Sequence, residues 1–417
     1  MSTSPSAFDP ITIGPLRLRN RFIKSGANEA MCIDGAPTHA LVRHHRELAA
    51  GGVGLTTVAY VAVSEEGRTL PNQIWMREQI LPDLRALTAA VHAEGGAISA
   101  QITHGGSFVT GIRLGRPAMS SVSGFNKAGL LAGNWRRRAM QTADMDLVTA
   151  QFVRTAELAR EAGFDAVELH MGHGYLLNQF ISPLDNRRRD EFGGSAQNRA
   201  RFPARVLAAV KQAVGRDLAV IAKINVADGV PGGADASDAA VTACALENAG
   251  ADLLVLSGGR NVESTWFMFG SLVDQQEIAR VLHDQWLSRL ALRLSALSAP
   301  RQVGFRESYL REHSLKVREA VGMPLAFLGG VKSLDSAEAA LADGFDCVVM
   351  ARALIHDTQL VNRMRSGETR RSGCTSCNRC VAYIYHADGT RCVENPPNDP
   401  ALNRVRASQP LPRAVSS

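Results

Sequence analysis

Two histidines and a tyrosine follow an apolar, β-branched run near the middle of the chain. The run Ala166–His170 is typical of a buried strand, and His173 and Tyr175 come three and five residues after His170. At the C-terminal end of a strand, these side chains can converge on one pocket. Neutral imidazoles can bind a carbonyl oxygen and stabilise charge that develops there, and a phenol can deliver a proton to carbon. The spacing predicts such chemistry, with structural or metal-binding histidines as the alternatives.

Four cysteines lie close together near the C-terminus. Their spacing is Cys374-x2-Cys377-x2-Cys380-x11-Cys392, whereas the other three cysteines are dispersed. Clustering of this kind indicates metal binding more than disulfides. Four thiolates within reach suit a [4Fe-4S] cluster or tetrahedral zinc. We predict a metal site here, and metal-free reduced thiols are the alternative.

The elements that must position these residues alternate along the chain from residue 20 to about 365. Short apolar runs are followed by longer helical segments, which is the pattern of βα units on a parallel sheet. The predicted strands are Arg21–Ser25, Val53–Tyr60, Ala97–Ile102, Ala166–His170, Ala219–Ile224, Leu253–Ser257, Leu325–Leu328 and Cys347–Met350. The predicted helices with the clearest periodicity are Leu147–Ala162, Arg199–Val214, Ala236–Ala249 and Leu334–Ala342. Eight units predict an α/β fold with a closed (β/α)8 TIM barrel, and the doubly wound open sheet is the competitor.

Three regions fall outside the regular alternation. We expect the barrel over 1–365, a four-cysteine extension packed on it over 366–400, and a disordered tail over 401–417. The stretches 107–144 and 260–307 interrupt the βα pattern where strands end. In a barrel, loops at the C-terminal ends of the strands build the active site. We therefore expect these two stretches to be lids or substrate loops, or else extra packing at the barrel mouth.

Composition excludes several classes of protein. The 417 residues are 45% hydrophobic and 21% charged, which is ordinary for a globular chain. The net charge is +6, but the basic residues are scattered and no nucleic-acid motif accompanies them. No apolar stretch approaches the ~20 residues that span a bilayer. We expect a cytoplasmic enzyme with a small-molecule substrate, no nucleic-acid or membrane partner, and a homo-oligomer as one option.

A long gapless segment runs from His170 through Tyr175-Leu176-Leu177-Asn178-Gln179-Phe180 and on to Phe192-Gly193-Gly194-Ser195. This segment resembles the Old Yellow Enzyme family of FMN-dependent NADH:flavin oxidoreductases. Further agreement occurs near the start and after strands three, seven and eight, at Leu18–Arg21, Ala100–Gly106, Gly329–Val331 and Met350–Arg352. The resemblance covers roughly residues 8 to 365 in barrel order.

The resemblance implies an FMN-bound barrel that works as an ene-reductase. Members take hydride from NAD(P)H and pass it from flavin N5 to the β-carbon of an α,β-unsaturated carbonyl compound or similar acceptor. His170 and His173 resemble the pair that binds the carbonyl oxygen of the acceptor. Tyr175 resembles the residue that protonates the neighbouring carbon. The expected partners are therefore a nicotinamide nucleotide and a small activated alkene.

The cofactor site implied by the resemblance draws on most of the barrel strands. Gln101 matches the amide that pairs with the pyrimidine edge of the flavin, and Lys223 falls beside flavin N1 and O2. Arg352 falls where the phosphate is held. The complete predicted set is Ser25, Gly26, Ala27, Tyr60, Gln101, Lys223, Gly329, Gly330, Ala351 and Arg352.

The chain departs from the family pattern in ways that bear on function. Asn28 stands where some relatives have a redox-tuning cysteine, and Ser107 replaces the usual arginine. The four-cysteine segment resembles the 2,4-dienoyl-CoA reductase branch, but Cys380 comes one residue early, and we do not expect the second dinucleotide-binding domain of that branch. An iron–sulfur flavoprotein of that branch is therefore an alternative. A non-catalytic flavin-binding redox sensor, or a metal-stabilised interaction protein, is the alternative of another class.

Overall fold

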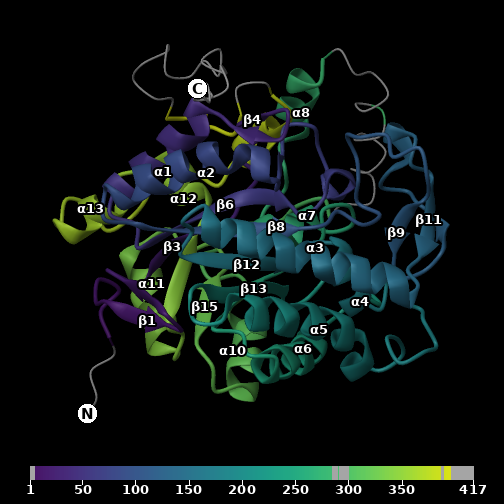
Figure 1. The fold of residues 1–417 in the computed structure, drawn as a ribbon. Coiled ribbons are helices and arrows are strands. Elements are labelled where there is room, and N and C mark those ends of the chain that lie inside the picture. The colour runs from purple at the N-terminus through teal and green to yellow at the C-terminus, as the bar shows by residue number, and fades with distance from the viewer. Residues whose placement is uncertain (1–4, 284–289, 291–299, 387–388, 396–417) are drawn as a thin grey trace, which may run out of the picture.

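Eight parallel strands close into a barrel with helices around it (Figure 1). The computed structural model describes the chain except residues 1–4, 284–289, 291–299, 387–388 and 396–417. The strands are β3 (Phe22–Lys24), β6 (Leu55–Ala62), β8 (Ala97–Thr103), β12 (Ala166–Met171), β13 (Ala219–Asn225), β14 (Leu253–Ser257), β15 (Leu325–Leu328) and β16 (Cys347–Met350). Each strand pairs with the next in parallel, and β3 pairs with both β16 and β6. The predicted TIM barrel is confirmed, and the open sheet is wrong.

The helices cover the outside of the barrel. They are α1 (His39–Ala50), α2 (Leu81–His92), α3 (Thr142–Glu161), α5 (Ala196–Val214), α6 (Ala236–Asn248), α10 (Arg311–Ala320), α11 (Leu334–Ala342), α12 (Arg352–His356) and α13 (Leu360–Arg365). The four predicted helices are confirmed, but α3 begins five residues before Leu147. Gln141 and Asp144 form a capping box there, which satisfies free backbone N–H groups of the first turn.

Alternation along the strands separates two cores. On β12, Val167 and Leu169 pack outward against helices, whereas Ala166 joins a separate cluster in the barrel interior. The antiparallel hairpin of β1 (Ile11–Ile13) and β2 (Leu16–Leu18) closes the end of the barrel where the strands begin, and it adds Leu18 to that cluster. Since side chains in a strand point to opposite faces, residues 168 and 170 share the inward face of Ala166.

The long loops gather at the other end of the barrel. The stretch 107–144 holds a three-stranded sheet of β9 (Ala118–Ser120), β10 (Gly124–Phe125) and β11 (Arg136–Ala139). The stretch 260–307 holds α7 (Thr265–Phe269) and α8 (Gln275–Val281), and part of it lies outside the described residues. A short helix, α4 (Leu176–Ile181), follows β12.

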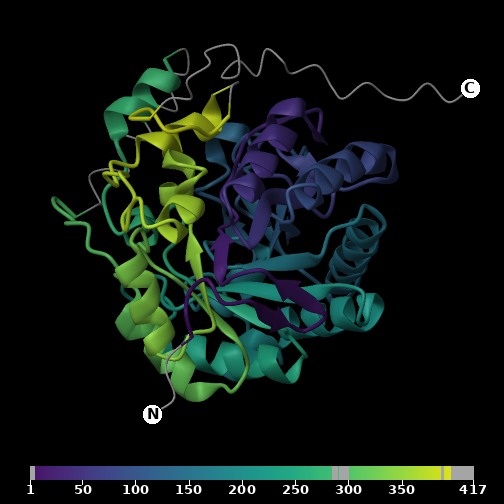
Figure 2. The same cartoon turned by 90° about the vertical axis from the view of Figure 1, so that its left-hand side faces the viewer.

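The four-cysteine extension lies beside α8. Its 3-10 helix η4 (Arg379–Tyr385) contributes Ala382 and Tyr383 to an apolar cluster with Ile278 and Leu282. Figure 2 shows this yellow segment next to the green helix α8. The predicted tail 401–417 lies outside the described residues, as does the end of the predicted extension.

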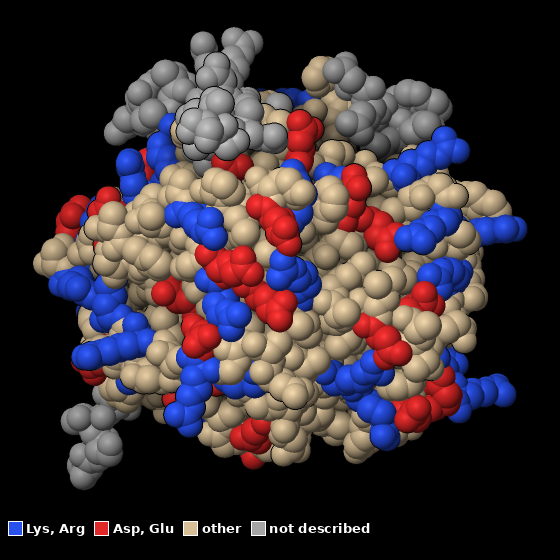
Figure 3. Space-filling model, viewed as in Figure 1, with Lys and Arg blue, Asp and Glu red and all other residues tan. Residues whose placement is uncertain are grey.

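Charged side chains of both signs are interspersed over the face of the molecule seen in Figure 3. This distribution agrees with the scattered basic residues of the sequence. Within the described part of the chain, no helix has the length and apolar character needed to cross a membrane.

Replacing Leu18 by alanine should destabilise the barrel. Leu18 is 1% exposed inside the interior cluster, so the smaller side chain leaves a cavity. We expect the free energy of unfolding to fall by about 2–5 kcal/mol, as measured by urea denaturation. The exposed neighbour Arg17 provides the matched control, because Arg17→Ala removes no buried contact. Equal stability of the two variants would contradict a packed hairpin at the base of the barrel.

Candidate active site

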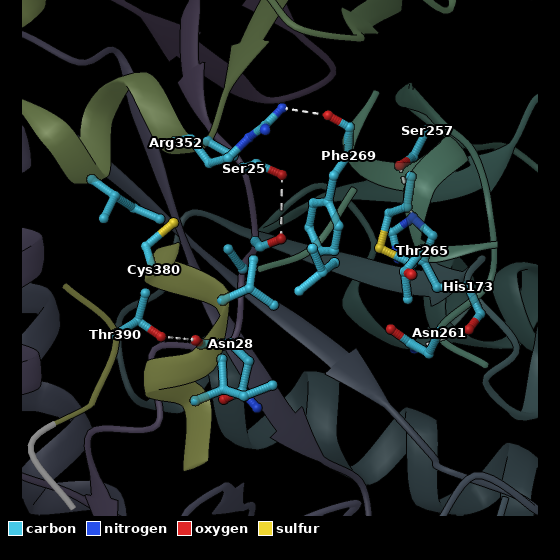
Figure 4. A pocket seen from close by; sticks show the side chains of 18 of the residues that line it. Ser25, Asn28, His173, Ser257, Asn261, Thr265, Phe269, Arg352, Cys380 and Thr390 are labelled. Carbon is cyan, nitrogen blue, oxygen red and sulfur yellow. Dashed lines mark hydrogen bonds between the residues drawn. The ribbon is translucent and has the colours of Figure 1, made fainter. Parts of the chain in front are cut away.

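A cavity of about 290 Å³ opens where the C-terminal ends of the strands meet. We call it the mouth cavity. Its wall includes residues 25–28 after β3, Tyr60 on β6, His173 and Tyr175 after β12, and Arg352 after β16. Figure 4 shows Ser25, Asn28, His173 and Arg352 among the lining side chains. Of the predicted catalytic and cofactor-binding residues, the following line it: Ser25, Gly26, Ala27, Tyr60, His173, Tyr175, Gly330, Ala351 and Arg352. The other residues of these two groups, Gln101, His170, Lys223 and Gly329, are not part of its lining.

Residues outside the lining still contact residues that line the mouth cavity. The His170 ring centroid lies 4.4 Å from that of Tyr175 and 4.9 Å from that of His173. Lys223 Nζ lies 3.2 Å from Ser25 Oγ. Thus the structure brings the predicted histidines, tyrosine and lysine to one place, as the sequence indicated.

Hydrogen bonds fix the loop that carries His173. Its backbone has a φ of 59°, a left-handed conformation that is uncommon outside glycine. Asn225 Oδ1 accepts from the His173 N–H at 3.1 Å, and Asn261 Nδ2 donates to its carbonyl oxygen at 2.9 Å. His173 Nε2 lies 2.8 Å from Ser257 Oγ, so the ring is held as well. Figure 4 shows Ser257 and Asn261 beside His173.

Burial sets the protonation of the histidine and tyrosine side chains. It lowers the pKa of His173 to about 3 and that of His170 well below its ordinary value, with the Lys223 charge acting in the same direction. Burial also raises the pKa of Tyr175 well above its usual range, and that of Tyr60 to about 12. At neutral pH the imidazoles are therefore uncharged and both phenols keep their protons.

The tautomer of His170 follows from its neighbour. The backbone N–H of Gly172 donates to His170 Nδ1 at 3.2 Å, so this nitrogen carries no proton. A neutral imidazole then has its proton on Nε2. His170 is therefore arranged as a hydrogen-bond donor through Nε2.

A polar cluster lies below the loop of residues 25–28. Gln101 Oε1 is buried without a hydrogen-bond partner. At Gly26, a Cβ atom would lie 2.6 Å from Gln101 Nε2, so a larger residue there would displace the Gln101 amide. Lys223 Nζ also lies 3.3 Å from the Gly26 carbonyl oxygen. An unpaired buried acceptor and a cation beside an open cavity suit a ligand edge that offers both a donor and an acceptor.

Glu168 is a further polar residue of this cluster, and it is not among the residues predicted from the sequence. Its Oε1 lies 3.0 Å from Lys223 Nζ and accepts a hydrogen bond from Gln101 Nε2. Strand alternation could have found this carboxylate, because Glu168 is two residues before His170 on β12 and shares its inward face.

The C-terminal extension forms one wall of the mouth cavity. Arg352 Nη2 donates to the carbonyl oxygen of Phe269 at 2.7 Å, and Nη1 donates to Asn378 Oδ1 in the extension. Asn378 Nδ2 in turn donates to Ser271 Oγ at 2.8 Å. Thr390 N donates to the Glu29 carbonyl oxygen at 2.8 Å, next to the loop of residues 25–28. No sequence pattern indicated Asn378 or Thr390.

The four predicted cysteine ligands surround a second, smaller cavity beside Arg352. Cys374, Cys377, Cys380 and Cys392 all line it. His356 Nδ1 lies 3.4 Å from Cys392 Sγ at the same place. However, no three histidine, cysteine or acidic side chains of the described residues are arranged to hold a metal ion. Metal binding by these thiols stays a prediction, and we derive no chemistry from it.

The closed barrel, with a cavity where the C-terminal ends of its strands meet, agrees with membership of a family of flavin oxidoreductases. Residues 6–265 match the NADH:flavin oxidoreductase / NADH oxidase family. The chain belongs to this family, which confirms the predicted resemblance. It is therefore an FMN-dependent oxidoreductase, and the prediction of an enzyme is confirmed.

Curated relatives share much of the chain. It is 39% identical over 402 residues to a 4,4'-dithiodibutanoate disulfide reductase of Rhodococcus erythropolis, covering 94% of this chain and 95% of that one. It is 29% identical to a metal reductase of Desulforamulus reducens, covering 93% of this chain but 53% of the relative. The chain thus spans about half the length of the latter relative.

Solved structures show the same fold. The Old Yellow Enzyme homologue of Zymomonas mobilis aligns with a TM-score of 0.70 at 20% identity, covering 94% of this chain and 98% of that one. A 2-naphthoyl-CoA reductase aligns with a TM-score of 0.77 at 22% identity, covering 94% of this chain and 57% of that one.

His170 and His173 should stay neutral through the range in which exposed histidines titrate, near pH 6.5. We expect their ring ¹⁵N shifts to be constant from pH 8 to pH 5, in spectra assigned with His170→Asn. Because their folded-state pKa values are lowered, the unfolded chain binds more protons, so their contribution to stability falls as pH decreases below about 6.5. A titration midpoint near 6.5 for either ring would contradict the buried arrangement.

Replacing Asn378 by alanine should weaken FMN binding more than riboflavin binding. The variant removes an acceptor that holds the Arg352 guanidinium, and only FMN carries the phosphate that Arg352 is predicted to bind. We expect a loss of about tenfold in FMN affinity, measured by titration of the apoprotein. Asn362→Ala is the control, since Asn362 donates to the Ala50 carbonyl oxygen away from the mouth cavity. Equal losses for FMN and riboflavin would rule out an effect through Arg352.

Proposed function

We propose that the protein is an NAD(P)H-dependent ene-reductase that works at the mouth cavity on an α,β-unsaturated carbonyl compound or a similar activated alkene. The observation that carries this proposal is a neutral donor and a protonated phenol side by side. His170 and Tyr175 have ring centroids 4.4 Å apart, and burial keeps both in these protonation states.

The residues around the mouth cavity suit FMN. Gln101 and Lys223 would hold the pyrimidine edge, with the unpaired Gln101 Oε1 available as an acceptor. The backbone of residues 25–27 would lie against the ring. Gly329, Gly330, Ala351 and Arg352 would hold the phosphate. FMN bound there would supply the two-electron chemistry of hydride transfer between NAD(P)H and the substrate.

The protein side chains bind and orient the substrate. His170 Nε2–H, with His173 beside it, donates to the substrate carbonyl oxygen and stabilises the negative charge that develops there. Ser257 and Asn225 hold His173 in place for this task. A neutral imidazole can do this without passing its proton to the substrate, because its N–H is a weak acid.

Tyr175 would deliver the proton. Its phenol belongs to an aromatic group with Tyr60 and Phe108, at centroid distances of 5.2 and 5.5 Å. These rings pack around the phenol ring of Tyr175. Because burial raises the pKa of Tyr175, the phenol stays protonated until the substrate acquires charge.

Reductive cleavage of a small disulfide is a second candidate function. The Rhodococcus relative with this activity in its name matches over almost the whole of both chains, including the extension. Two electrons and two protons would convert the disulfide to two thiols. Cys374 and Cys380 line the mouth cavity, so a substrate there would contact thiols of the extension.

Turnover of both substrate classes tests the proposed function. With FMN and NADPH or NADH under exclusion of oxygen, a simple enone should be consumed, and a low-molecular-weight disulfide serves as the competing substrate.

His170→Ala should weaken the binding of phenolic and enone ligands by about tenfold or more, because it removes the hydrogen-bond donor. Turnover of disulfides alone, insensitive to His170, would favour the second candidate.

Tyr175→Phe should slow reduction of enones by about 10²-fold or more, because it removes the proton donor. Reduction of the bound flavin by NAD(P)H should change little, since that step needs no proton from Tyr175. Rapid-mixing absorption measurements separate the two steps. Tyr383→Phe is the control, since Tyr383 is a buried tyrosine that donates to Glu277 and lies outside the mouth cavity. Equal slowing of both steps by Tyr175→Phe would argue against proton delivery.

A further inference from the structure

Glu168 is a buried carboxylate in the barrel interior that no part of the proposed reaction uses. It is 2% exposed and stands directly opposite Gln101 in the pairing of β12 with β8. Its Oε1 accepts from Gln101 Nε2 and lies 3.0 Å from Lys223 Nζ. One carboxylate oxygen therefore holds both side chains that are proposed to meet the pyrimidine edge of the flavin.

The Lys223 ammonium depends on this carboxylate for charge balance. Lys223 is 1% exposed, and its other hydrogen-bond partners are the neutral Ser25 Oγ and the Gly26 carbonyl oxygen. Among the described residues, Glu168 is the acidic side chain paired with it. A buried charge without a partner is costly, so the pair fixes the position of the ammonium as well as its field.

We propose that Glu168 is a positioning residue that sets the reduction potential of the bound flavin through Lys223. This inference rests on the proposed placement of Lys223 beside flavin N1 and O2. Reduction adds electron density to that part of the ring, and a nearby cation stabilises it. The Glu168 carboxylate, 3.0 Å from the ammonium, offsets part of the lysine charge and so holds the potential down.

The contacts of Glu168 and Lys223 also connect three strands with one loop. Glu168 is on β12, Gln101 on β8 and Lys223 on β13, and Lys223 reaches the loop of residues 25–28. Loss of the carboxylate would therefore change two measurable properties of the flavin. The reduction potential of the flavin would rise, and the Gln101 amide at its pyrimidine edge would no longer be held in position.

The test compares the midpoint potential of bound FMN in wild-type protein, Glu168→Gln and Glu168→Asp. In Glu168→Gln we expect the reduced form to be favoured by about tenfold relative to wild type, which is about +30 mV for a two-electron couple. Glu168→Asp keeps the charge, so its potential should lie close to the wild-type value. Asp252→Asn is the control, because Asp252 pairs with Lys211 at 2.6 Å outside the mouth cavity. Its potential should not change.

A double-variant cycle decides whether the effect passes through Lys223. Lys223→Met removes the cation, and a buried carboxylate without its cation takes up a proton, so adding Glu168→Gln to it should shift the potential much less than Glu168→Gln does alone. If Glu168→Gln alone does not fold, the double variant, which lacks both buried charges, is compared with Lys223→Met. A difference of about +30 mV between these two would then overturn the inference. An equal shift in both backgrounds would overturn the inference.

Failure of this inference is distinguishable from failure of the proposed function. If wild-type protein does not bind FMN, the proposed site is wrong. If FMN-loaded Glu168→Gln has the wild-type potential, only the role of Glu168 is wrong. Loss of stability without a change of potential would show a purely structural carboxylate and would contradict the proposal.

Discussion

Buried polar groups must be paired or hydrogen-bonded, and this constraint determines the active end of the barrel. The inward face of β12 carries Glu168 and His170 where an ordinary barrel strand would carry apolar side chains. Glu168 pairs with Lys223 and accepts a hydrogen bond from Gln101, both on neighbouring strands, and His170 accepts a hydrogen bond from the Gly172 N–H. Among the described residues of this cluster, Gln101 Oε1 is an acceptor without a hydrogen-bond partner. It marks the place where a bound ligand would donate a hydrogen bond.

The C-terminal extension belongs to the same arrangement. Its Asn378 holds Arg352, and its Thr390 bonds to the backbone beside the loop of residues 25–28. Cys380 lies between these two contacts in the chain, Cys374 and Cys377 precede them, and Cys392 follows them. Whatever state the thiols adopt, the extension is a wall of the mouth cavity, so that state can influence flavin and substrate together.

Much of the barrel and of its mouth could be predicted from the sequence, because both depend on local patterns. Apolar runs of strand length gave all eight strands, and the His170 to Tyr175 segment directly after one of them located the site. Asn378 and Thr390 could not be predicted, since their partners are distant in the chain and hydrogen bonds of single polar residues leave no periodicity. Glu168 was predictable from strand alternation but was overlooked, because an acidic residue inside an apolar run has no motif of its own. The start of α3 was placed too late because capping by Gln141 and Asp144 precedes the apolar periodicity.

We propose that the mouth cavity would hold FMN beside His170, His173 and Tyr175, and a crystal structure of the FMN-loaded protein with a phenolic ligand tests this placement. We expect the pyrimidine edge at Gln101 and Lys223, the phosphate at Gly330 and Arg352, and the ligand oxygen within hydrogen-bond distance of His170 Nε2. FMN bound elsewhere, or a ligand that contacts neither histidine, would contradict it.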